Sequence, residues 1–255
     1  MLVIGGSVGL TGAPILCAEG ALRSGAGLVS VAVPKAVYSM VARKAPAEIM
    51  VHPRSALPVL LRKADVIALG PGLSRTPQAR QLVRRLLSRT RQPMVIDADG
   101  ILALKGMKSL RRSAGIVITP HPGEMAALLG STAHAVQADR KKIAVKTAKR
   151  LGAVVVLKGH HTVIASPEGK SFVNVTGNPG MATGGSGDVL TGIIAALIGQ
   201  GLGPFSAAKA GVYVHGLAGD EAARQVGEIS LLAGDILAAL PTVFKKLAKS
   251  VSTPA

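Results

Sequence analysis

The residues best suited to chemistry lie in one glycine-rich segment, residues 177–192, with the sequence GNPGMATGGSGDVLTG. Gly184, Gly185 and Gly187 carry no Cβ, so an anion can come close to their backbone amides. The apolar pattern that follows predicts a helix starting near Ser186, whose unpaired N–H groups and positive dipole end also favour an anion. The segment therefore predicts a phosphate site, or anion hole, formed by Gly184, Gly185, Ser186 and Gly187.

Asp188 directly follows this anion hole, although a bound phosphate would repel its carboxylate. One interpretation is structural, because an acidic residue in the first turn stabilises a helix by ~0.3–1 kcal/mol. The other is a general base aimed at a substrate hydroxyl that attacks phosphorus, as phosphoryl transfer requires. The dense glycine context favours the second interpretation, and Asp188 is the predicted catalytic residue.

Four further motifs precede this segment, and each follows a predicted strand, where ligands bind in α/β sheets. They are Gly5-Gly6-Ser7 with residues 9–13 (GLTGA), Gly70-Pro71-Gly72, residues 119–124 (TPHPGE) and residues 158–162 (KGHHT). The first lacks the Gly-x-Gly-x-x-Gly spacing, and no carboxylate ends the next strand, which excludes a Rossmann dinucleotide site. No Gly-x-x-x-x-Gly-Lys-Ser/Thr occurs, which excludes a P-loop.

Two of these motifs carry side chains that could contact a ligand. In residues 119–124, Pro122 suits the first position of a helix and Glu124 could complete a capping box, but neither explains an imidazole at His121. A ligand contact by His121 is therefore favoured. Lys158 closes another apolar run and precedes Gly159 and Thr162, a pattern that suits a nucleotide phosphate or ribose.

Metal sites receive weaker support from the sequence. His160 and His161 are adjacent, and side chains of adjacent residues on an extended segment point in opposite directions, so we expect no zinc site there. Asp97 and Asp99 follow an apolar run and could either hold Mg²⁺ through water or cap the next helix. Both interpretations of this aspartate pair stay open.

The periodicity of the chain predicts a doubly wound α/β fold. Continuous Val- and Ile-rich runs indicate strands buried in a parallel sheet, at Leu2–Ile4, Leu28–Val33, Val66–Leu69, Met94–Ile96, Ile116–Thr119 and Val154–Leu157. Helical patterns occupy Pro14–Arg23, Gln78–Ser88, Gln137–Leu151 and the segment from Gly187 to about Lys249. Residues 162–175 alternate around the turn sequence SPEG and predict a β-hairpin at the sheet edge. With no linker or repeat, residues 1–255 are predicted to form a single domain.

Composition predicts a cytoplasmic protein with no membrane segment. No apolar run approaches the ~18–20 residues of a membrane-spanning helix, and no signal peptide is recognisable. The single cysteine, Cys17, fits a reducing compartment. Met1 begins almost inside the first strand, and such a short terminal strand is expected to be poorly anchored. We therefore expect either additional residues upstream in the natural product or a loss of residues from this sequence.

The net charge of +17 raises the question of nucleic-acid binding. The basic residues are spread over many predicted helices, and only three Phe, two Tyr and no Trp are available for stacking on bases. A solvated basic surface is therefore the favoured interpretation, with electrostatic steering of small polyanions as a milder functional one.

The chain resembles a known enzyme family through these motifs. Residues 185–188 (GSGD) resemble the anion-hole and base motif of ribokinase-like enzymes. Together with residues 178–183 (NPGMAT), they more narrowly resemble the ADP-dependent NAD(P)H-hydrate dehydratases. The resemblance covers nearly the whole chain through five motifs in order. It implies a ribokinase-like fold, with a doubly wound, mostly parallel central sheet, helices on both faces and an edge β-hairpin.

The resemblance also implies a reaction and its participants. The ring hydroxyl of (6S)-NADHX or NADPHX would be phosphorylated by ADP, and loss of phosphate would then give NAD(P)H, with AMP as the other product. Mg²⁺ would serve as cofactor. A homo-oligomer, with a tetramer as one arrangement, and a functional link to an NAD(P)HX epimerase are further implications. The implied contacts to the hydrated dinucleotide are Ala13, Gly72, His121 and Asp188, and those to AMP or ADP are Lys158, Gly159, His160, His161, Thr162 and Gly187.

Two alternative functions remain for comparison. A small-molecule kinase of the same fold, of the thiazole or pyrimidine type, would usually carry Cys in place of Asp188 and lack the pattern of residues 121–124. A nucleic-acid-binding protein is supported by charge alone. The sequence leaves open the preference between ADP and ATP and between NADHX and NADPHX, although the resemblance favours ADP.

Overall fold

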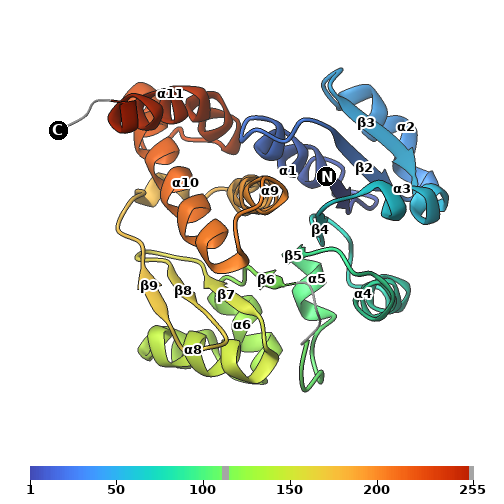
Figure 1. The fold of residues 1–255 in the computed structure, drawn as a ribbon, viewed down its shortest axis with the longest axis horizontal. Helices are drawn as coiled ribbons and strands as arrows, with labels where there is room; N and C mark the ends of the chain where they lie inside the picture. The colour runs from blue at the N-terminus through green and yellow to red at the C-terminus, as the bar shows by residue number, and fades with distance from the viewer. Residues whose placement is uncertain (111–114, 253–255) are drawn as a thin grey trace.

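The computed structural model describes residues 1–110 and 115–252, and within them the strands form a single nine-stranded sheet (Figure 1). The strand order is β3-β2-β1-β4-β5-β6-β7-β8-β9. Strands β1 to β7 are parallel, and β8 and β9 add an antiparallel hairpin at one edge. The strands are β1 Leu2–Ile4, β2 Val29–Val33, β3 Ile49–Pro53, β4 Ile67–Leu69, β5 Met94–Ile96, β6 Ile116–Ile118, β7 Val154–Leu157, β8 Val163–Ala165 and β9 Ser171–Val173.

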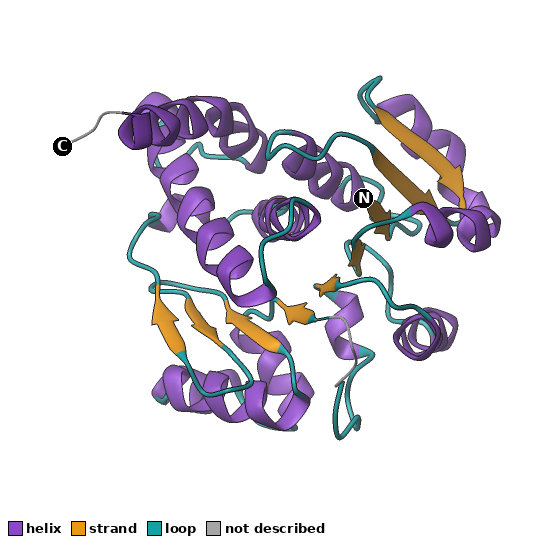
Figure 2. Ribbon diagram, viewed as in Figure 1, coloured by secondary structure: helices purple, strands orange, loops and turns teal. Residues whose placement is uncertain are grey.

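Helices cover both faces of the sheet (Figure 2). Helices α1, α2, α9 and α10 pack on one face, helices α3 to α8 lie on the other, and α11 packs on α9 and α10. The helices are α1 Ala13–Leu22, α2 Lys35–Lys44, α3 Leu57–Lys63, α4 Pro77–Arg89, α5 Asp99–Leu102, α6 Pro122–Leu129, α7 Ala133–Ala138, α8 Arg140–Leu151, α9 Ser186–Gly199, α10 Pro204–Val226 and α11 Ala233–Ser252, with short 3₁₀ turns at Arg54–Ala56 and Pro179–Met181.

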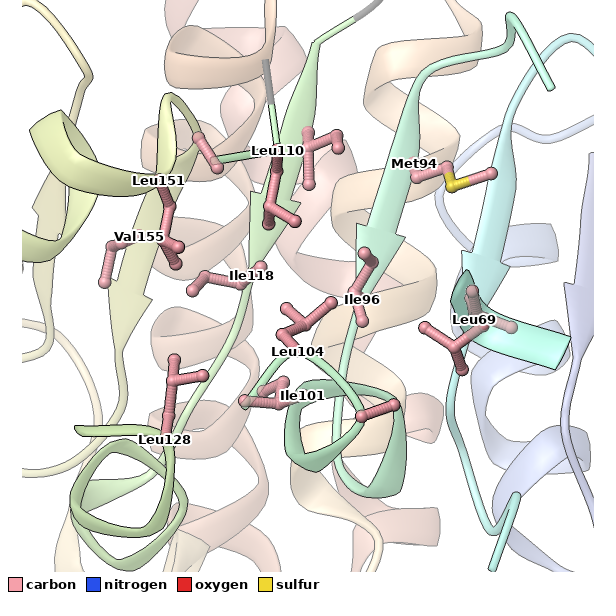
Figure 3. Close-up of a cluster of buried hydrophobic side chains, with 14 of the residues drawn as sticks. Leu69, Met94, Ile96, Ile101, Leu104, Leu110, Ile118, Leu128, Leu151 and Val155 are labelled. Atoms are coloured by element: carbon pink, nitrogen blue, oxygen red, sulfur yellow. The ribbon is translucent and has the colours of Figure 1, made fainter. Parts of the chain in front are cut away.

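Two hydrophobic cores follow from the alternation of side chains along each strand. In β1, Leu2 and Ile4 belong to the core under α3 to α8, whereas Val3 belongs to the core under α1, α9 and α10. Figure 3 shows the first core, in which Ile96 and Ile118 of the sheet lie beside Leu104. Because both faces are buried, the strands are continuous apolar runs, and the predicted doubly wound α/β fold with an edge hairpin is confirmed.

The structure departs from the sequence prediction in two elements. Strand β3 was not predicted, because it lies at the sheet edge, ends in Pro53 and leaves Met50 partly exposed, so it lacks a continuous apolar run. The helix predicted over Gln137–Leu151 is wrong in its first turn. Asp139 leaves helical geometry with φ −147°, and its carboxylate accepts a hydrogen bond from the Lys142 amide at 3.2 Å, which starts a new helix, α8.

The first strand is firmly held, contrary to expectation. It pairs with β2 on one side and β4 on the other, so it lies in the middle of the sheet. Its residues are at most 1% exposed, and the Met1 amino group donates to the Leu28 carbonyl at 2.8 Å. Among the described residues, none of the helices combines the length and apolar character that crossing a membrane requires.

Candidate active site

The polar groups of the site gather where parallel strands end. Asp97 follows β5, Thr119 follows β6 and Lys158 follows β7, so register places them at the same edge of the sheet. The Asp97 Oδ1 atom accepts hydrogen bonds from Thr119 Oγ1 and from Lys158 Nζ, each at 2.8 Å. Asp97 is 1% exposed, so this ion pair is shielded from water and forms the floor of the site.

The charge of Lys158 is stabilised by two carboxylates. Burial alone would lower its pKa, but Asp97 and, at 3.9 Å, Glu124 Oε2 raise it, so the net shift is upward. The pKa of Glu124 is also raised, chiefly by burial, with Lys158 opposing the shift. Lys158 therefore stays a cation at neutral pH and can attract an anionic ligand.

The glycine-rich segment turns into α9 directly above this cation. Gly185 has φ 92°, a left-handed conformation that suits glycine, and the helix begins at Ser186 as predicted. A methyl group on Gly187 would come within 2.9 Å of Lys158 Nζ, whereas one on Gly184 would meet nothing within 4 Å. In the part of the chain that the structure describes, the amides of Gly187 and Asp188 have no hydrogen-bond acceptor. These groups are available to an anion.

Asp188 occupies the first turn of α9, close to this set of charges. Burial raises its pKa to about 8, Asp97 adds to the shift, and Lys158 opposes it. A carboxyl group with such a pKa gains and loses its proton near physiological pH, which suits a general base. Burial and the neighbouring carboxylates therefore disfavour the charged form of Asp188 even without a bound phosphate.

A cavity of about 710 Å³ opens beside the start of α9. Its lining contains all the residues predicted to contact adenine nucleotide, namely Lys158, Gly159, His160, His161, Thr162 and Gly187. His121 also lines it, although it was assigned to the other substrate. The structure therefore brings the predicted nucleotide residues together in one place and puts His121 beside them.

The loop from Lys158 to Thr162 is held by Arg140, the first residue of α8. The guanidinium donates to the carbonyls of His160 at 2.6 Å and Leu157 at 2.9 Å. The expectation that the two histidine rings diverge is wrong, because the loop turns at His161 (φ 54°) and the rings stack at 3.8 Å. Across the described residues, no group of three or more His, Cys, Asp or Glu side chains is arranged to hold a metal ion.

His121 has a structural role that the sequence did not reveal. Its Nδ1 atom accepts hydrogen bonds from the amides of Gly123 at 3.0 Å and Glu124 at 3.3 Å, while the Glu124 carboxylate accepts from the His121 amide at 2.9 Å. The predicted capping box of α6 is thus confirmed, and the imidazole itself is the cap. The His121 side chain is still 56% exposed, so the part of the ring that does not form the cap is accessible to a ligand.

Ala13 and Gly72 lie together in a second region. Gly72 has φ 62°, and a methyl group on it would come within 2.6 Å of the Leu10 carbonyl and 3.2 Å of the Ala13 Cβ. Neither Ala13 nor Gly72 lines the 710 Å³ cavity, and nor does Asp188. Of the four residues predicted to contact the hydrated dinucleotide, only His121 lines the nucleotide cavity, and Asp188 adjoins it next to Gly187.

The two aspartates that could hold Mg²⁺ differ in their availability. Asp99 accepts from the Ser74 amide at 2.9 Å through Oδ2 and pairs with Arg75 Nε at 3.1 Å through Oδ1. It is the first residue of α5 and anchors the loop that follows β4, so its metal-binding interpretation is not supported. Asp97 uses Oδ1 for its protein partners and keeps Oδ2 near Gly187.

Two polar residues, one lining the cavity and one behind its wall, were not predicted from the sequence. His215 of α10 is 8% exposed and its Nε2 lies 3.3 Å from Ser186 Oγ. Asp220, one turn further along α10, accepts from the Gly177 amide at 2.9 Å and from Asn178 Nδ2 at 3.0 Å, which fixes the cavity wall. These side chains lie inside a long helix, where no local motif marks them.

Comparisons with known proteins show which family the chain is similar to. A family model described as NAD(P)H-hydrate dehydratase matches residues 1–242. The bifunctional NAD(P)H-hydrate repair enzyme of Moorella thermoacetica is 53% identical over 268 residues, which cover 99% of this chain and 50% of the relative. This chain likewise spans about half the length of other bifunctional relatives that it matches.

Two solved structures share the fold. The ADP/ATP-dependent NAD(P)H-hydrate dehydratase of Bacillus subtilis, co-crystallised with ATP and Mg²⁺, is 32% identical with a TM-score of 0.86, covering 96% of this chain and 88% of that chain. A ribokinase-like superfamily protein of Enterococcus faecalis is 34% identical with a TM-score of 0.82, covering 96% and 86%. The ribokinase-like fold expected from the sequence is therefore confirmed.

Proposed function

The chain belongs to the NAD(P)H-hydrate dehydratase family, and we propose that it regenerates NADH and NADPH from (6S)-NADHX and NADPHX. ADP is the proposed phosphoryl donor, with AMP and phosphate as products. The observation that carries this proposal is the position of Asp188, a carboxyl group with a pKa of about 8 beside an open glycine anion site and the Lys158 cation.

The proposed reaction has two steps. Asp188 accepts the proton of the ring hydroxyl while the hydroxyl oxygen bonds to the β-phosphorus of ADP, and the bond to the AMP oxygen breaks. The amides at Gly184 to Gly187 would hold the charge that develops on the phosphoryl oxygens. Phosphate then leaves the ring carbon, driven by the ring nitrogen lone pair, and loss of a proton from the neighbouring carbon restores the double bond.

Mg²⁺ is the proposed cofactor, bound mainly through the diphosphate of the donor. Protein sites for Mg²⁺ commonly use one or two carboxylates together with substrate phosphates. Asp97 would take part through Oδ2, directly or through water, because its protein partners bind Oδ1. When bound, the ion would neutralise charge on the diphosphate. Asp99 is not part of this proposal, because both of its oxygens already have protein partners.

The decisive experiment is incubation with hydrated NADH and either ADP or ATP, following the absorbance of regenerated NADH. We expect regeneration with ADP, and the Lys158→Ala variant should bind ADP more weakly than the unaltered chain while its affinity for hydrated NADH changes less. An absence of NADH with both donors, in protein that binds ADP, would refute the dehydratase and favour the kinase alternative. Transfer of phosphate to a thiazole or pyrimidine alcohol would support that alternative directly.

The remaining expectations, about partners, location and domain organisation, stay predictions. They are a homo-oligomer, a functional link to an NAD(P)HX epimerase, a cytoplasmic location and a single domain over residues 1–255. The bifunctional character of the Moorella thermoacetica relative supports a link to a second repair activity, because this chain matches only half of that protein.

A further inference from the structure

His215 and Ser186 form a buried polar pair at the base of the nucleotide cavity. Ser186 is the first residue of α9 and is 6% exposed, and His215 reaches it from α10. The Ser186 Oγ atom and His215 Nε2 are 3.3 Å apart, and both residues line the cavity together with Lys158 and Gly187. Neither residue is needed to hold the other's helix, since α9 and α10 already pack through apolar residues.

The Ser186 hydroxyl does not cap its own helix. The N-cap of α9 is Gly185, and no side chain caps the first turn. A serine hydroxyl bonds the N–H groups of the first turn when the serine is the N-cap residue, and Ser186 is one position after the N-cap. Here the hydroxyl is directed to an imidazole instead, beside the unoccupied amides of Gly187 and Asp188.

The direction of this hydrogen bond decides what the hydroxyl presents to an anion. Burial lowers the pKa of His215 to about 4, with the charge of Lys158 adding to the shift and a hydrogen bond to the Ser186 backbone opposing it, so the ring is neutral and has one N–H. If Nε2 accepted the serine hydrogen, the oxygen lone pairs of Ser186 would face the phosphate and repel it. If Nε2–H donates to Oγ, the serine hydrogen is left to point at the phosphate. Beside an anion, the second arrangement is the more stable one.

We propose that His215 is a positioning residue that fixes the Ser186 hydroxyl as a hydrogen-bond donor to the transferred phosphoryl group. The inference deepens the proposed function and rests on it. His215 does not touch the reacting atoms in this arrangement, and it acts only through Ser186. Its loss should therefore slow phosphoryl transfer more than it weakens ADP binding.

The test is a double-mutant cycle on the full chain with hydrated NADH and ADP. Removing one such donor from an anion hole costs about 10²-fold in turnover, and we expect this loss for Ser186→Ala and about 10-fold for His215→Leu. In the Ser186→Ala background, His215→Leu should have almost no further effect. Full additivity of the two losses, or normal kcat in His215→Leu, would overturn the inference. The exposed residue His134 provides a control, and His134→Leu should match the unaltered chain.

Rescue by a conservative variant separates positioning from packing. A glutamine at position 215 can place an amide N–H where Nε2 lies, whereas the shorter asparagine cannot. His215→Gln should thus keep kcat within about 3-fold, and His215→Asn should lose about 10-fold, about half in free energy of an anion-hole donor's contribution. Equal activity of the two variants would refute the inference even if His215→Leu failed to fold. Failure of the unaltered chain to regenerate NADH would instead refute the proposed function itself.

Discussion

Lys158 Nζ donates a hydrogen bond to Asp97 Oδ1 at 2.8 Å, and this pair joins the ends of β7 and β5 across the intervening strand. The partnership leaves the lysine charge compensated before any ligand arrives. A phosphate that binds Lys158 must therefore share the ammonium group with Asp97. Because Lys158 then neutralises only part of the phosphate charge, a phosphoryl donor that carries a bound divalent metal ion would be favoured. The same carboxylate acts on Asp188, whose pKa it raises.

Asp188→Asn should separate chemistry from binding. The amide cannot accept a proton, so turnover should fall by about two orders of magnitude or more, the usual scale for a general base. ADP affinity should change little, because the predicted nucleotide contacts are elsewhere. Steady-state kinetics and calorimetric titration measure the two quantities. Asp65→Asn, at an exposed site, is the control, and near-normal turnover in Asp188→Asn would remove this residue from the mechanism.

The pH dependence should report the raised pKa of Asp188. A base must be deprotonated to act, so kcat/KM should increase with pH and reach half of its plateau near pH 8. Because Asp97 contributes to the raised pKa, Asp97→Asn should move this inflection to lower pH in whatever activity remains. A profile that is flat between pH 6 and 9 would contradict the assignment.

The same shift predicts how stability depends on pH. The folded state holds the Asp188 proton up to about pH 8, whereas an unfolded aspartate releases it near pH 4, so the unaltered chain loses stability as pH rises between these values. Asp188→Asn removes this loss. Its free energy of unfolding should exceed that of the unaltered chain by on the order of 5 kcal/mol at pH 9, since each unit of pKa shift corresponds to about 1.4 kcal/mol, with little difference at pH 4, as measured by denaturant titration.

Two substitutions of His121 can distinguish capping from ligand contact. Asparagine is a good N-cap and alanine is a poor one, so His121→Ala should lose ~1 kcal/mol of stability and His121→Asn much less. If the imidazole also contacts the hydrated dinucleotide, both variants should raise its KM. A normal KM in the stable His121→Asn variant would limit His121 to its structural role.

A matched pair of glycines tests the region of Ala13. Gly72→Ala would place a methyl group 2.6 Å from the Leu10 carbonyl, so the loop before α1 must move, and the KM for hydrated NADH should rise more than that for ADP. Gly106 has a similar left-handed φ of 84° but no neighbour within 4 Å. Gly106→Ala therefore carries the same backbone cost without the displacement, and equal kinetics of the two variants would exclude a role for this loop.

Salt should distinguish steering of small anions from binding of nucleic acid. Screening beyond a Debye length of ~8 Å slows association of ADP, but hydrogen bonds within a cavity are screened far less. A protein with about 6 phosphate contacts would lose about 10³-fold in DNA affinity between 50 and 200 mM salt. We expect weak DNA binding that disappears at physiological salt and ADP binding that persists. Sub-micromolar duplex binding at 150 mM salt would reopen the nucleic-acid function.

The sequence predicted the features that local patterns encode. The start of α9 and the edge hairpin follow from glycines and a turn sequence within a few residues, and both are confirmed. Features that depend on distant residues were missed. His215 and Ser186 are in contact although they are 29 residues apart in the chain. The hydrogen bond from the Ser74 amide to the Asp99 carboxylate depends on where the loop after β4 lies.

The interruption between α7 and α8 at Asp139 shows a different reason why a feature could not be predicted from the sequence. The apolar periodicity of α7 continues into α8, so the pattern alone predicts one helix, while the cap that restarts the helix uses an aspartate that also occurs inside helices. The capping role of His121 was missed for the same reason, because histidine is not among the usual capping residues. In both cases, the decisive hydrogen bond involves a side chain whose type permits several roles.

The central position of β1 has a consequence for how the chain reaches its native state. Strand β1 precedes both of its partner strands in the chain, and Leu2 pairs with Ile67, about 65 residues later, as well as with β2. The middle of the sheet therefore cannot close until β4 has emerged, and the contacts it needs are far apart in sequence, which slows folding. During that interval the apolar β1 has no lasting partner on its β4 side, a condition under which nascent chains associate with one another and depend on chaperones.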